Sequence, residues 1–229
     1  STGRIVWRQT APVGRFETTH PLGNPATPTP VTDGERVYVY FGSYGLLAYD
    51  LTGREQWRKP LPPPVVEFGV SSSPVLAGPR LIQLCDQDLN SSLLAVDART
   101  GATLWRTARP EFRRGFATPF LWRHDDFEEL VVPGSIWLKA YDVADGRERW
   151  SLSGTARVPC SSPVAGDGLL FSASWNIGGD PADRVRMPPF AEYAIEHDRN
   201  RDGRLTRDEI PAGAVRDRFG QMDLDKDGQ

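Results

Sequence analysis

The run AVDARTGATLW, from Ala95 to Trp105, contains an Ala-x-Asp, then a glycine, then a tryptophan four residues after that glycine. The same order occurs in AYDLTGREQW, from Ala48 to Trp57, and in AYDVADGRERW, from Ala140 to Trp150. Self-similarity at a period of about 45 residues indicates a repeat architecture. The order is kept although the stretch from Asp50 to Gly53 is one residue shorter than its counterparts.

A further landmark, a hydroxyl residue followed by proline, recurs at spacings of 44, 45 and 44 residues. It occurs at Thr29-Pro30, Ser73-Pro74, Thr118-Pro119 and Ser162-Pro163. Between these landmarks, the apolar runs Val37–Tyr40, Leu81–Leu84 and Leu130–Val132 predict buried strands bounded by turn residues. A four-stranded unit repeated about every 40 to 50 residues is typical of a β-propeller blade.

The predicted fold class is therefore all-β, a partial β-propeller of four-stranded blades, with a small α-helical module. Residues 1–187 form the tail of one blade, three blades and the start of a fourth, which reaches Leu169–Phe171 and then Trp175–Asp180. We expect each tryptophan to fill the gap between neighbouring blades, where one ring buries about 150 to 250 Å². The glycine before it supplies the turn.

Residues 188–229 form a different module, decided by the run D-R-N-R-D-G-R-L-T-R-D-E at 198–209. A calcium ion takes six to eight oxygens, and a helix-loop-helix site supplies them from alternate positions of a twelve-residue loop. Gly203 stands at the sixth position, where the chain must turn sharply. The predicted Ca²⁺ ligands are Asp198, Asn200, Asp202, the Arg204 carbonyl, Thr206 and Glu209.

A second loop begins at Asp223, and Asp225, Asp227 and Gly228 repeat the third, fifth and sixth positions. Its last ligand is missing, because the sequence stops at Gln229. We expect a short helix over Phe190–His197 before the first loop. One amphipathic helix within Ile210–Met222, with Pro211 in its first turn, should serve both loops.

Four arginines occupy non-ligand positions of the first loop and repel a cation, at Arg199, Arg201, Arg204 and Arg207. At about 10 Å, each costs a divalent ion roughly 0.3 kcal/mol after screening. We therefore expect a weak site, micromolar to millimolar. Its role is expected to be more structural than regulatory, because an ion would order an insert too small to fold on its own core.

The tryptophan-containing runs resemble the docking motif of the pyrroloquinoline-quinone-like β-propeller repeat family, over residues 1 to about 175. Residues 188–229 resemble the EF-hand family. The first resemblance implies a periplasmic or otherwise extracytoplasmic protein, because that family includes quinoprotein dehydrogenases and the scaffold lipoprotein of outer-membrane protein assembly. The resemblance to propeller proteins that carry such inserts implies that the module is an insertion in the fourth blade.

The quinone PQQ is a possible cofactor under this resemblance, but it is not favoured. In the dehydrogenases the calcium lies in the axial funnel of the propeller, whereas the calcium motif here is peripheral. The adjacent cysteine pair of many such enzymes is absent, since Cys85 and Cys160 are 75 residues apart. We expect both cysteines to be buried small residues.

Composition bounds the remaining possibilities. The net charge of -3 gives no indication of nucleic acid or an acidic membrane surface, and no apolar run is long enough for a transmembrane segment. The chain begins at Ser1 inside the tail of a repeat and stops inside a calcium loop, so we expect a fragment.

The sequence predicts a calcium-binding β-propeller that serves as an extracytoplasmic binding or scaffold protein, without assigned catalytic residues. Its partner is a protein or a small-molecule ligand on the propeller face. The alternative is a PQQ-dependent alcohol or sugar dehydrogenase, which reconstitution with the quinone and calcium would reveal as dye reduction.

Overall fold

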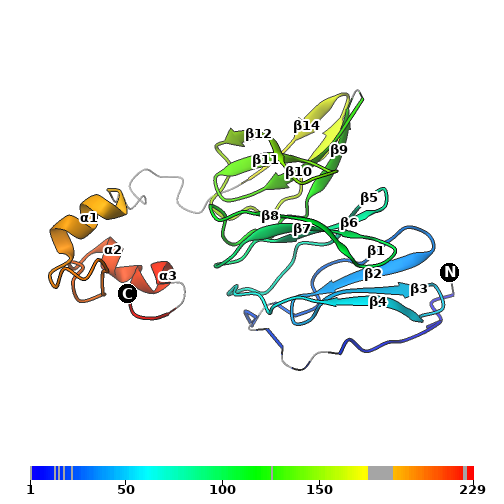
Figure 1. The fold of residues 1–229 in the computed structure, drawn as a ribbon, viewed down its shortest axis with the longest axis horizontal. Helices are drawn as coiled ribbons and strands as arrows, with labels where there is room; N and C mark the ends of the chain where they lie inside the picture. The colour runs from blue at the N-terminus through cyan, green and yellow to red at the C-terminus, as the bar shows by residue number, and fades with distance from the viewer. Residues whose placement is uncertain are drawn as a thin grey trace. The chain divides into compact units, whose positions relative to one another are not determined.

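A computed structural model describes residues 2–12, 14, 16–17, 19–21, 23–124, 126–174, 188–223 and 226–229 of the chain. The chain forms two compact units, Ser1–Trp175 and Asn176–Gln229 (Figure 1). The boundary expected at residue 187, and the predicted stretch Trp175–Asp180, fall among residues 175–187, which lie outside the described residues.

The first unit consists of antiparallel sheets whose strands follow each other in chain order. The first sheet contains β1 (Val31–Thr32), β2 (Arg36–Phe41), β3 (Gly45–Asp50) and β4 (Glu55–Pro60). The second contains β5 (Val75–Ala77), β6 (Arg80–Cys85), β7 (Ser92–Asp97) and β8 (Thr103–Ala108). The third contains β9 (Phe120–His124), β10 (Phe127–Pro133), β11 (Trp137–Asp142) and β12 (Glu148–Ser153). The start of a fourth is the hairpin of β13 (Val164–Gly166) and β14 (Leu169–Phe171).

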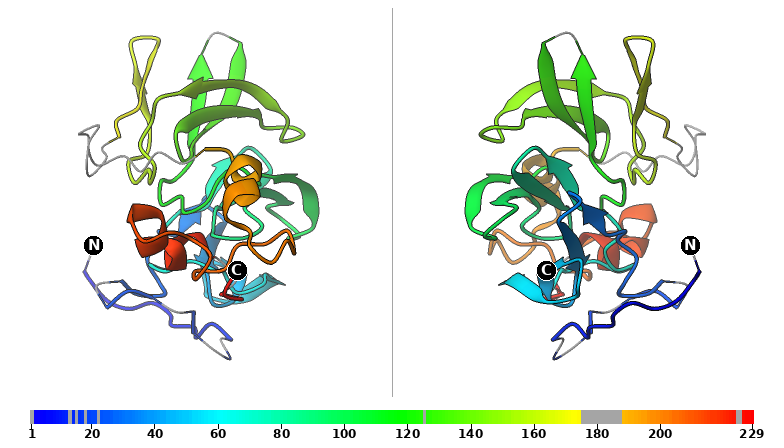
Figure 2. Two further views of the ribbon diagram at one scale, coloured as in Figure 1. Left: turned by 90° about the vertical axis from the view of Figure 1, so that its left-hand side faces the viewer. Right: turned by 90° about the vertical axis from the view of Figure 1, so that its right-hand side faces the viewer.

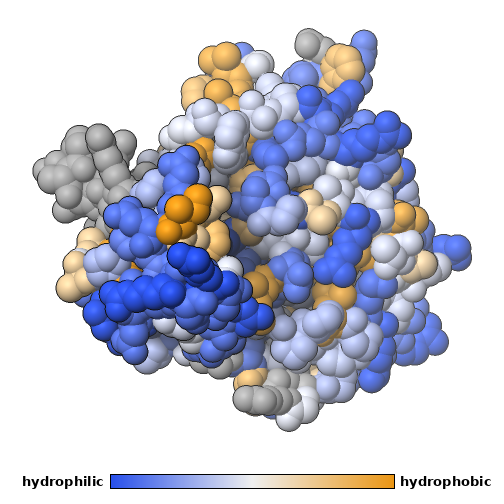
Figure 3. Space-filling view, turned by 60° about the vertical axis from the view of Figure 1, so that its left-hand side comes forward, coloured by the Kyte–Doolittle hydropathy of each residue, from blue (hydrophilic) through white to orange (hydrophobic). Residues whose placement is uncertain are grey.

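These sheets are the predicted blades of a partial β-propeller. Figures 1 and 2 show the three four-stranded sheets lying one after another in chain order. Their first strands are neighbours, since β1 contacts β5 and β5 contacts β9. On the face drawn in Figure 3, hydrophobic side chains form small patches separated by hydrophilic ones.

Each Ala-x-Asp closes the turn between the third and fourth strands of its blade. The Asp50 carboxylate accepts hydrogen bonds from the Thr52 and Arg54 amides, at 2.9 and 3.0 Å. Asp97 accepts from the Thr100 amide at 2.8 Å. The strand register shifts directly after the alanine in all three blades, and this alanine pairs across the sheet with the blade's tryptophan. A small residue is required there because the ring occupies the space opposite.

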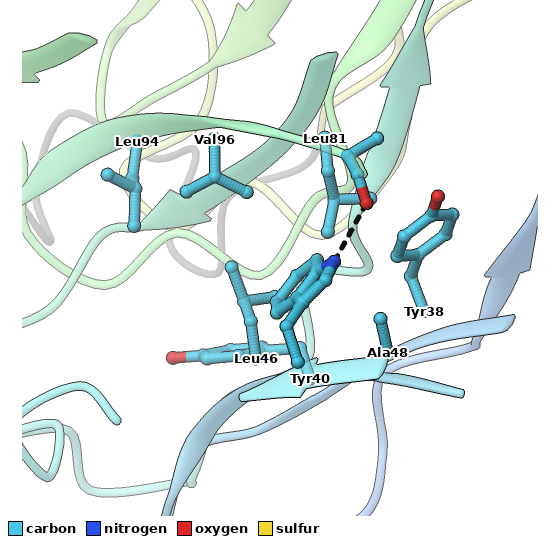
Figure 4. Packing of buried hydrophobic residues seen from close by; sticks show 9 residues of the cluster. Tyr38, Tyr40, Leu46, Ala48, Leu81, Leu94 and Val96 are labelled. Atoms are coloured by element: carbon cyan, nitrogen blue, oxygen red, sulfur yellow. Dashed lines mark hydrogen bonds between the residues drawn. The ribbon is translucent and has the colours of Figure 1, made fainter. Parts of the chain in front are cut away.

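The hydrophobic core lies between neighbouring blades. Its first cluster joins residues of the first and second blades: Tyr38, Tyr40, Leu46, Ala48, Trp57, Leu81, Leu94, Val96 and Ala98. Figure 4 shows Leu81, Leu94 and Val96 facing the first blade. Equivalent clusters join the second blade to the third and the third to Leu170 of β14.

The tryptophans connect successive repeats, which confirms their predicted structural role. The indole N–H of Trp57 donates to the Ala98 carbonyl at 2.8 Å (Figure 4), and that of Trp105 donates to the Val143 carbonyl at 3.2 Å. Each acceptor directly follows the Ala-x-Asp of the next repeat. Trp150 instead bonds Glu129 of its own blade at 2.8 Å.

The hydroxyl residues before the prolines connect the same repeats at the first strands. The amide of Thr29 donates to the Ser73 hydroxyl at 2.8 Å, and that of Ser73 to the Thr118 hydroxyl at 3.0 Å. The Thr118 amide continues the series to Ser162 at 3.0 Å. The proline has no backbone N–H to donate. The residue before it therefore supplies both groups of this hydrogen-bonded series, its amide as the donor and its hydroxyl as the acceptor.

A buried ion pair lies between the second and third blades. Arg109, almost fully buried, donates two parallel hydrogen bonds to the Asp86 carboxylate at 2.8 and 2.9 Å. A third guanidinium N–H donates to the Tyr141 hydroxyl, and the Phe112 ring lies 4.0 Å from the guanidinium carbon. The sequence did not predict this group, because its members are 23 and 32 residues apart.

The prediction that both cysteines are buried is wrong for Cys160, which is exposed at the start of the hydroxyl-proline segment. Cys85 is partly buried, and burial raises the pKa of its thiol to about 12. Both thiols are free. A position beside a strand does not by itself ensure burial, since Cys160 precedes the solvent-exposed hairpin of β13 and β14.

The described residues of the second unit include the helices α1 (Phe190–His197), α2 (Ala214–Asp217) and α3 (Phe219–Met222). Helix α1 has the predicted bounds. The single helix expected within Ile210–Met222 is wrong, because it is divided at Arg218, whose φ of -100° and ψ of 7° are not helical. Pro211 is not in a first turn either, since Gly213 adopts a φ of 145° and the helix begins after it.

Candidate metal centre

The first predicted loop begins where α1 ends. The Asp198 amide donates to the Ala194 carbonyl at 2.8 Å, so this residue continues the last helical turn and then leaves it with a φ of -70° and a ψ of 88°. Positive φ values follow at Arg201, 59°, and Gly203, 80°. Two residues with left-handed backbone conformations, only two positions apart, bend the chain into a compact loop.

The first carboxylate lies inside this loop. Asp198 Oδ1 accepts from the Arg201 amide at 2.7 Å, and its Oδ2 accepts from the Gly203 amide at 2.9 Å. Asp202 Oδ1 accepts from the Arg204 amide at 2.9 Å, and its Oδ2 accepts from the Asn200 side chain at 2.8 Å. Three of the predicted ligands are therefore gathered within one turn of the chain.

Glu209 links the two ends of the loop. Its Oε2 accepts from the Thr206 amide and hydroxyl, both at 2.9 Å, and its Oε1 accepts from the Arg199 and Asn200 amides at 3.2 and 3.4 Å. The Thr206 amide, followed by its hydroxyl, lowers the pKa of this carboxyl, so it is ionised at neutral pH. The twelfth position is thus brought beside the third and the ninth.

The second loop repeats this backbone geometry. Asp223 follows α3 with a φ of -72° and a ψ of 88°, and its amide donates to the Phe219 carbonyl at 2.8 Å. Lys226 and Gly228 have φ values of 59° and 86°. The Gly228 amide donates to Asp223 Oδ2 at 3.1 Å, and the Gln229 amide to Asp227 Oδ1 at 2.9 Å. The predicted ligand Asp225 lies outside the described residues.

The loops are supported by apolar side chains and by one direct contact. Leu205, Ile210 and Phe219 are buried. Arg204 of the first loop donates a side-chain hydrogen bond to Gln229 of the second. This contact uses the guanidinium group of Arg204. Its backbone carbonyl, which is the predicted ligand, is not involved.

The ligand set differs from a cluster of carboxylates and imidazoles. In the described part of the chain, no group of three or more His, Cys, Asp and Glu side chains is placed to hold a metal ion. Three of the six predicted first-loop ligands belong to these types, Asp198, Asp202 and Glu209, and they are not arranged as such a group. The remainder are an amide, a hydroxyl and a backbone carbonyl, which are suitable oxygen donors for Ca²⁺ and poor ones for transition metals.

Glu17 is a further titratable group inside the first unit. The amide of Glu17 donates to the Ser43 hydroxyl at 2.9 Å, and both oxygens of its carboxylate are buried. Burial raises the pKa of Glu17 to about 6, against the opposing effect of the Val70 amide. A β-carbon on Gly42 would lie 1.8 Å from its Oε2, so only glycine leaves room for this carboxylate.

The consecutive four-stranded sheets and their tryptophan contacts define a β-propeller repeat protein. The family model that matches the sequence, described as outer membrane protein assembly factor BamB, covers residues 1–124. This is more than half of the 229 residues, and the chain belongs to this family. The predicted calcium loops lie outside the matched residues.

A solved structure has a similar fold. BamB from Moraxella catarrhalis is 19% identical, with a TM-score of 0.52 over 65% of this chain and 46% of that chain. A quinohemoprotein alcohol dehydrogenase from Comamonas testosteroni is 19% identical, with a TM-score of 0.43 over 61% of this chain and 22% of that one. The chain thus spans less than half of the length of either protein. A comparison with curated proteins finds no match.

Proposed function

We propose that this protein is a calcium-binding β-propeller that serves as an extracytoplasmic binding or scaffold protein. The helical unit is an EF-hand module in this proposal, and Ca²⁺ is its ion. The first site takes oxygens from Asp198, Asn200, Asp202 and Glu209, together with the Arg204 carbonyl and Thr206. Asp223, Asp225 and Asp227 begin the second.

The observation that carries the calcium proposal is the agreement between the two loops. Both begin with an aspartate whose amide closes a helix, at Asp198 and Asp223, with dihedral angles that agree within 2°. Both then place positive φ at the fourth and sixth positions and bond the sixth amide to the first carboxylate. The two loops begin 25 residues apart and share the same uncommon backbone conformation. This agreement supports the proposal that both loops place ligands for an ion.

The role of the ion in this proposal is structural. The unit has short helices, and its described core contains few large apolar side chains. Small units of this kind gain stability when an ion is bound only by the folded state. The Arg204 to Gln229 contact lets an ion in the first loop also restrain the second.

The propeller in this proposal presents a partner-binding face. The family described as an outer membrane protein assembly factor supports a protein partner and an extracytoplasmic location, periplasmic in a cell with an outer membrane. No helix in the described residues is long and apolar enough to cross a bilayer.

Calorimetric titration with Ca²⁺ tests the proposal on the whole chain. We expect saturable binding in the micromolar to millimolar range, weakened on the order of tenfold to a hundredfold by Glu209→Gln, because one carboxylate charge is lost. Asp208→Asn is the matched control, since its side chain is exposed and lies at a non-ligand position. Equal affinity of the two variants, or no binding up to several millimolar, contradicts the calcium site.

A further inference from the structure

The helical unit separates its charges between the inside and the outside of the first loop. The carboxylates of Asp198 and Glu209 accept hydrogen bonds from loop amides, so they point inward. The arginines at the second, fourth, seventh and tenth positions are all exposed: Arg199, Arg201, Arg204 and Arg207. Net charge alone does not reveal this arrangement.

None of these four arginines has a carboxylate partner among the described residues, and Arg204 donates to the Gln229 side chain instead. Some exposed arginines of the propeller differ, since Arg54 lies 3.2 Å from Asp50 and Arg58 lies 2.5 Å from Glu55. The guanidinium groups of the loop are thus available for an external anion, and their planar donors suit phosphate oxygens.

The charge of the loop depends on its ion. Residues 198–209 contain four acidic and four basic side chains, so their formal charge is zero. With one Ca²⁺ bound the formal charge becomes +2, and all of the arginines remain on the outside. Attraction to an anionic surface is therefore coupled to ion binding.

The same unit exposes large apolar side chains. Ile195 on α1 is 87% exposed, Phe190 at the start of that helix is 56% exposed, and Met222 at the end of α3 is 38% exposed. Exposed apolar side chains and exposed arginines are the two features that hold peripheral proteins on anionic bilayers. An acidic protein partner would instead require a matching pocket for each protruding side chain.

We propose that the calcium-loaded helical unit docks on an anionic phospholipid bilayer, with Arg199, Arg201 and Arg207 contacting lipid phosphates. Ile195, three residues before the loop, enters the interfacial region. This inference rests on the proposed calcium site and adds its partner. Calcium binding raises the affinity for the bilayer, because it removes the compensating negative charge of the loop.

Cosedimentation of the whole chain with phosphatidylglycerol and phosphatidylcholine vesicles tests this inference, with saturating Ca²⁺ or with a chelator. We expect calcium-dependent binding to the anionic vesicles that weakens with added salt. The triple variant R199Q/R201Q/R207Q should bind on the order of a hundredfold more weakly, from roughly fivefold for each arginine. The control R54Q/R58Q/R147Q removes the same charge at exposed arginines of the propeller.

Calorimetry on the same samples separates the two proposals. Calcium binding without vesicle binding overturns the bilayer inference and leaves the calcium site intact, whereas absence of calcium binding overturns both. The bilayer inference is also overturned if the triple variant and the control lose equal amounts of vesicle binding, or if the chelator leaves vesicle binding unchanged. Full competition by soluble glycerol phosphate, or preferential retention by polyglutamate, assigns the arginines to a different anion. An Ile195→Ser variant changes an exposed side chain that is not a predicted ligand, and it should weaken vesicle binding without changing calcium affinity.

Discussion

The substitution Gly101→Ala tests how the tryptophan of one repeat is seated on the next. Gly101 has a φ of 72°, and an added β-carbon would lie 2.7 Å from Cε3 of Trp57. The same arrangement holds for Gly53 against Trp7 and for Gly146 against Trp105. Glycine is therefore needed for two reasons, its backbone conformation and the close approach of the ring.

The expected loss of unfolding free energy in Gly101→Ala combines these two effects. An alanine forced into the left-handed region costs about 1 to 2 kcal/mol. Displacing the Trp57 ring also loses its hydrogen bond to the Ala98 carbonyl, about 1 kcal/mol, and part of its buried contact with the second blade. We expect Gly101→Ala to lower the free energy of unfolding by about 3 to 4 kcal/mol.

Gly78→Ala is a control in the same blade. Gly78 has a φ of 56°, and nothing lies within 4 Å of the added β-carbon, so only the backbone effect of about 1 to 2 kcal/mol remains. Urea unfolding followed by circular dichroism measures both variants, and tryptophan fluorescence reports whether the ring has moved. Losses that agree within about 0.5 kcal/mol, the usual effect of a surface change, refute the seating argument.

Three further predictions concern groups between blades. Arg109→Met should cost about 3 to 5 kcal/mol of unfolding free energy, because Asp86 stays buried without its partner, whereas Asp86→Leu with Arg109→Met should cost less; equal losses in urea unfolding contradict this. Since burial raises the pKa of Glu17 from 4.5 to about 6, the folded state binds this proton more tightly than the unfolded state, and stability should fall as pH rises from about 4.5 to 6. Glu17→Gln should remove that part of the slope and stabilise the protein at pH 7 by at most about 1 kcal/mol, because the side chain is only half-buried and solvent screens it; a pH series of thermal melts showing the same slope in both proteins contradicts the assignment. Thr118→Val leaves the Ser73 amide without its acceptor and should cost about 1 to 3 kcal/mol, while Thr118→Ser should cost less; no difference between them in urea unfolding rules out the hydroxyl series as a stabilising contact.

Much of the fold could be predicted because its signals are local. The Ala-x-Asp turn, the glycine and the apolar strand runs act within about a dozen residues, and the repeats report the same signal three times. The bounds of α1 were predictable for the same reason. The division of the helix expected within Ile210–Met222 was not, because an amphipathic pattern carries no information about the φ of 145° at Gly213. The amides that Asp198 and Glu209 bond were also not predictable from spacing alone.

The sequence by itself determined the repeat period, the residues that form each blade and the oxygen-bearing positions of the loops, since each depends on residues adjacent along the chain. Only the tertiary structure decided which carbonyl accepts from Trp57, which hydroxyl accepts from Ser73, and that Asp86 and Arg109 meet in the interior. It also decided that the loop carboxylates point inward while the arginines remain exposed. These contacts join segments separated by up to 45 residues, and they depend on how whole blades and helices bury their surfaces against each other, which no short stretch of sequence specifies.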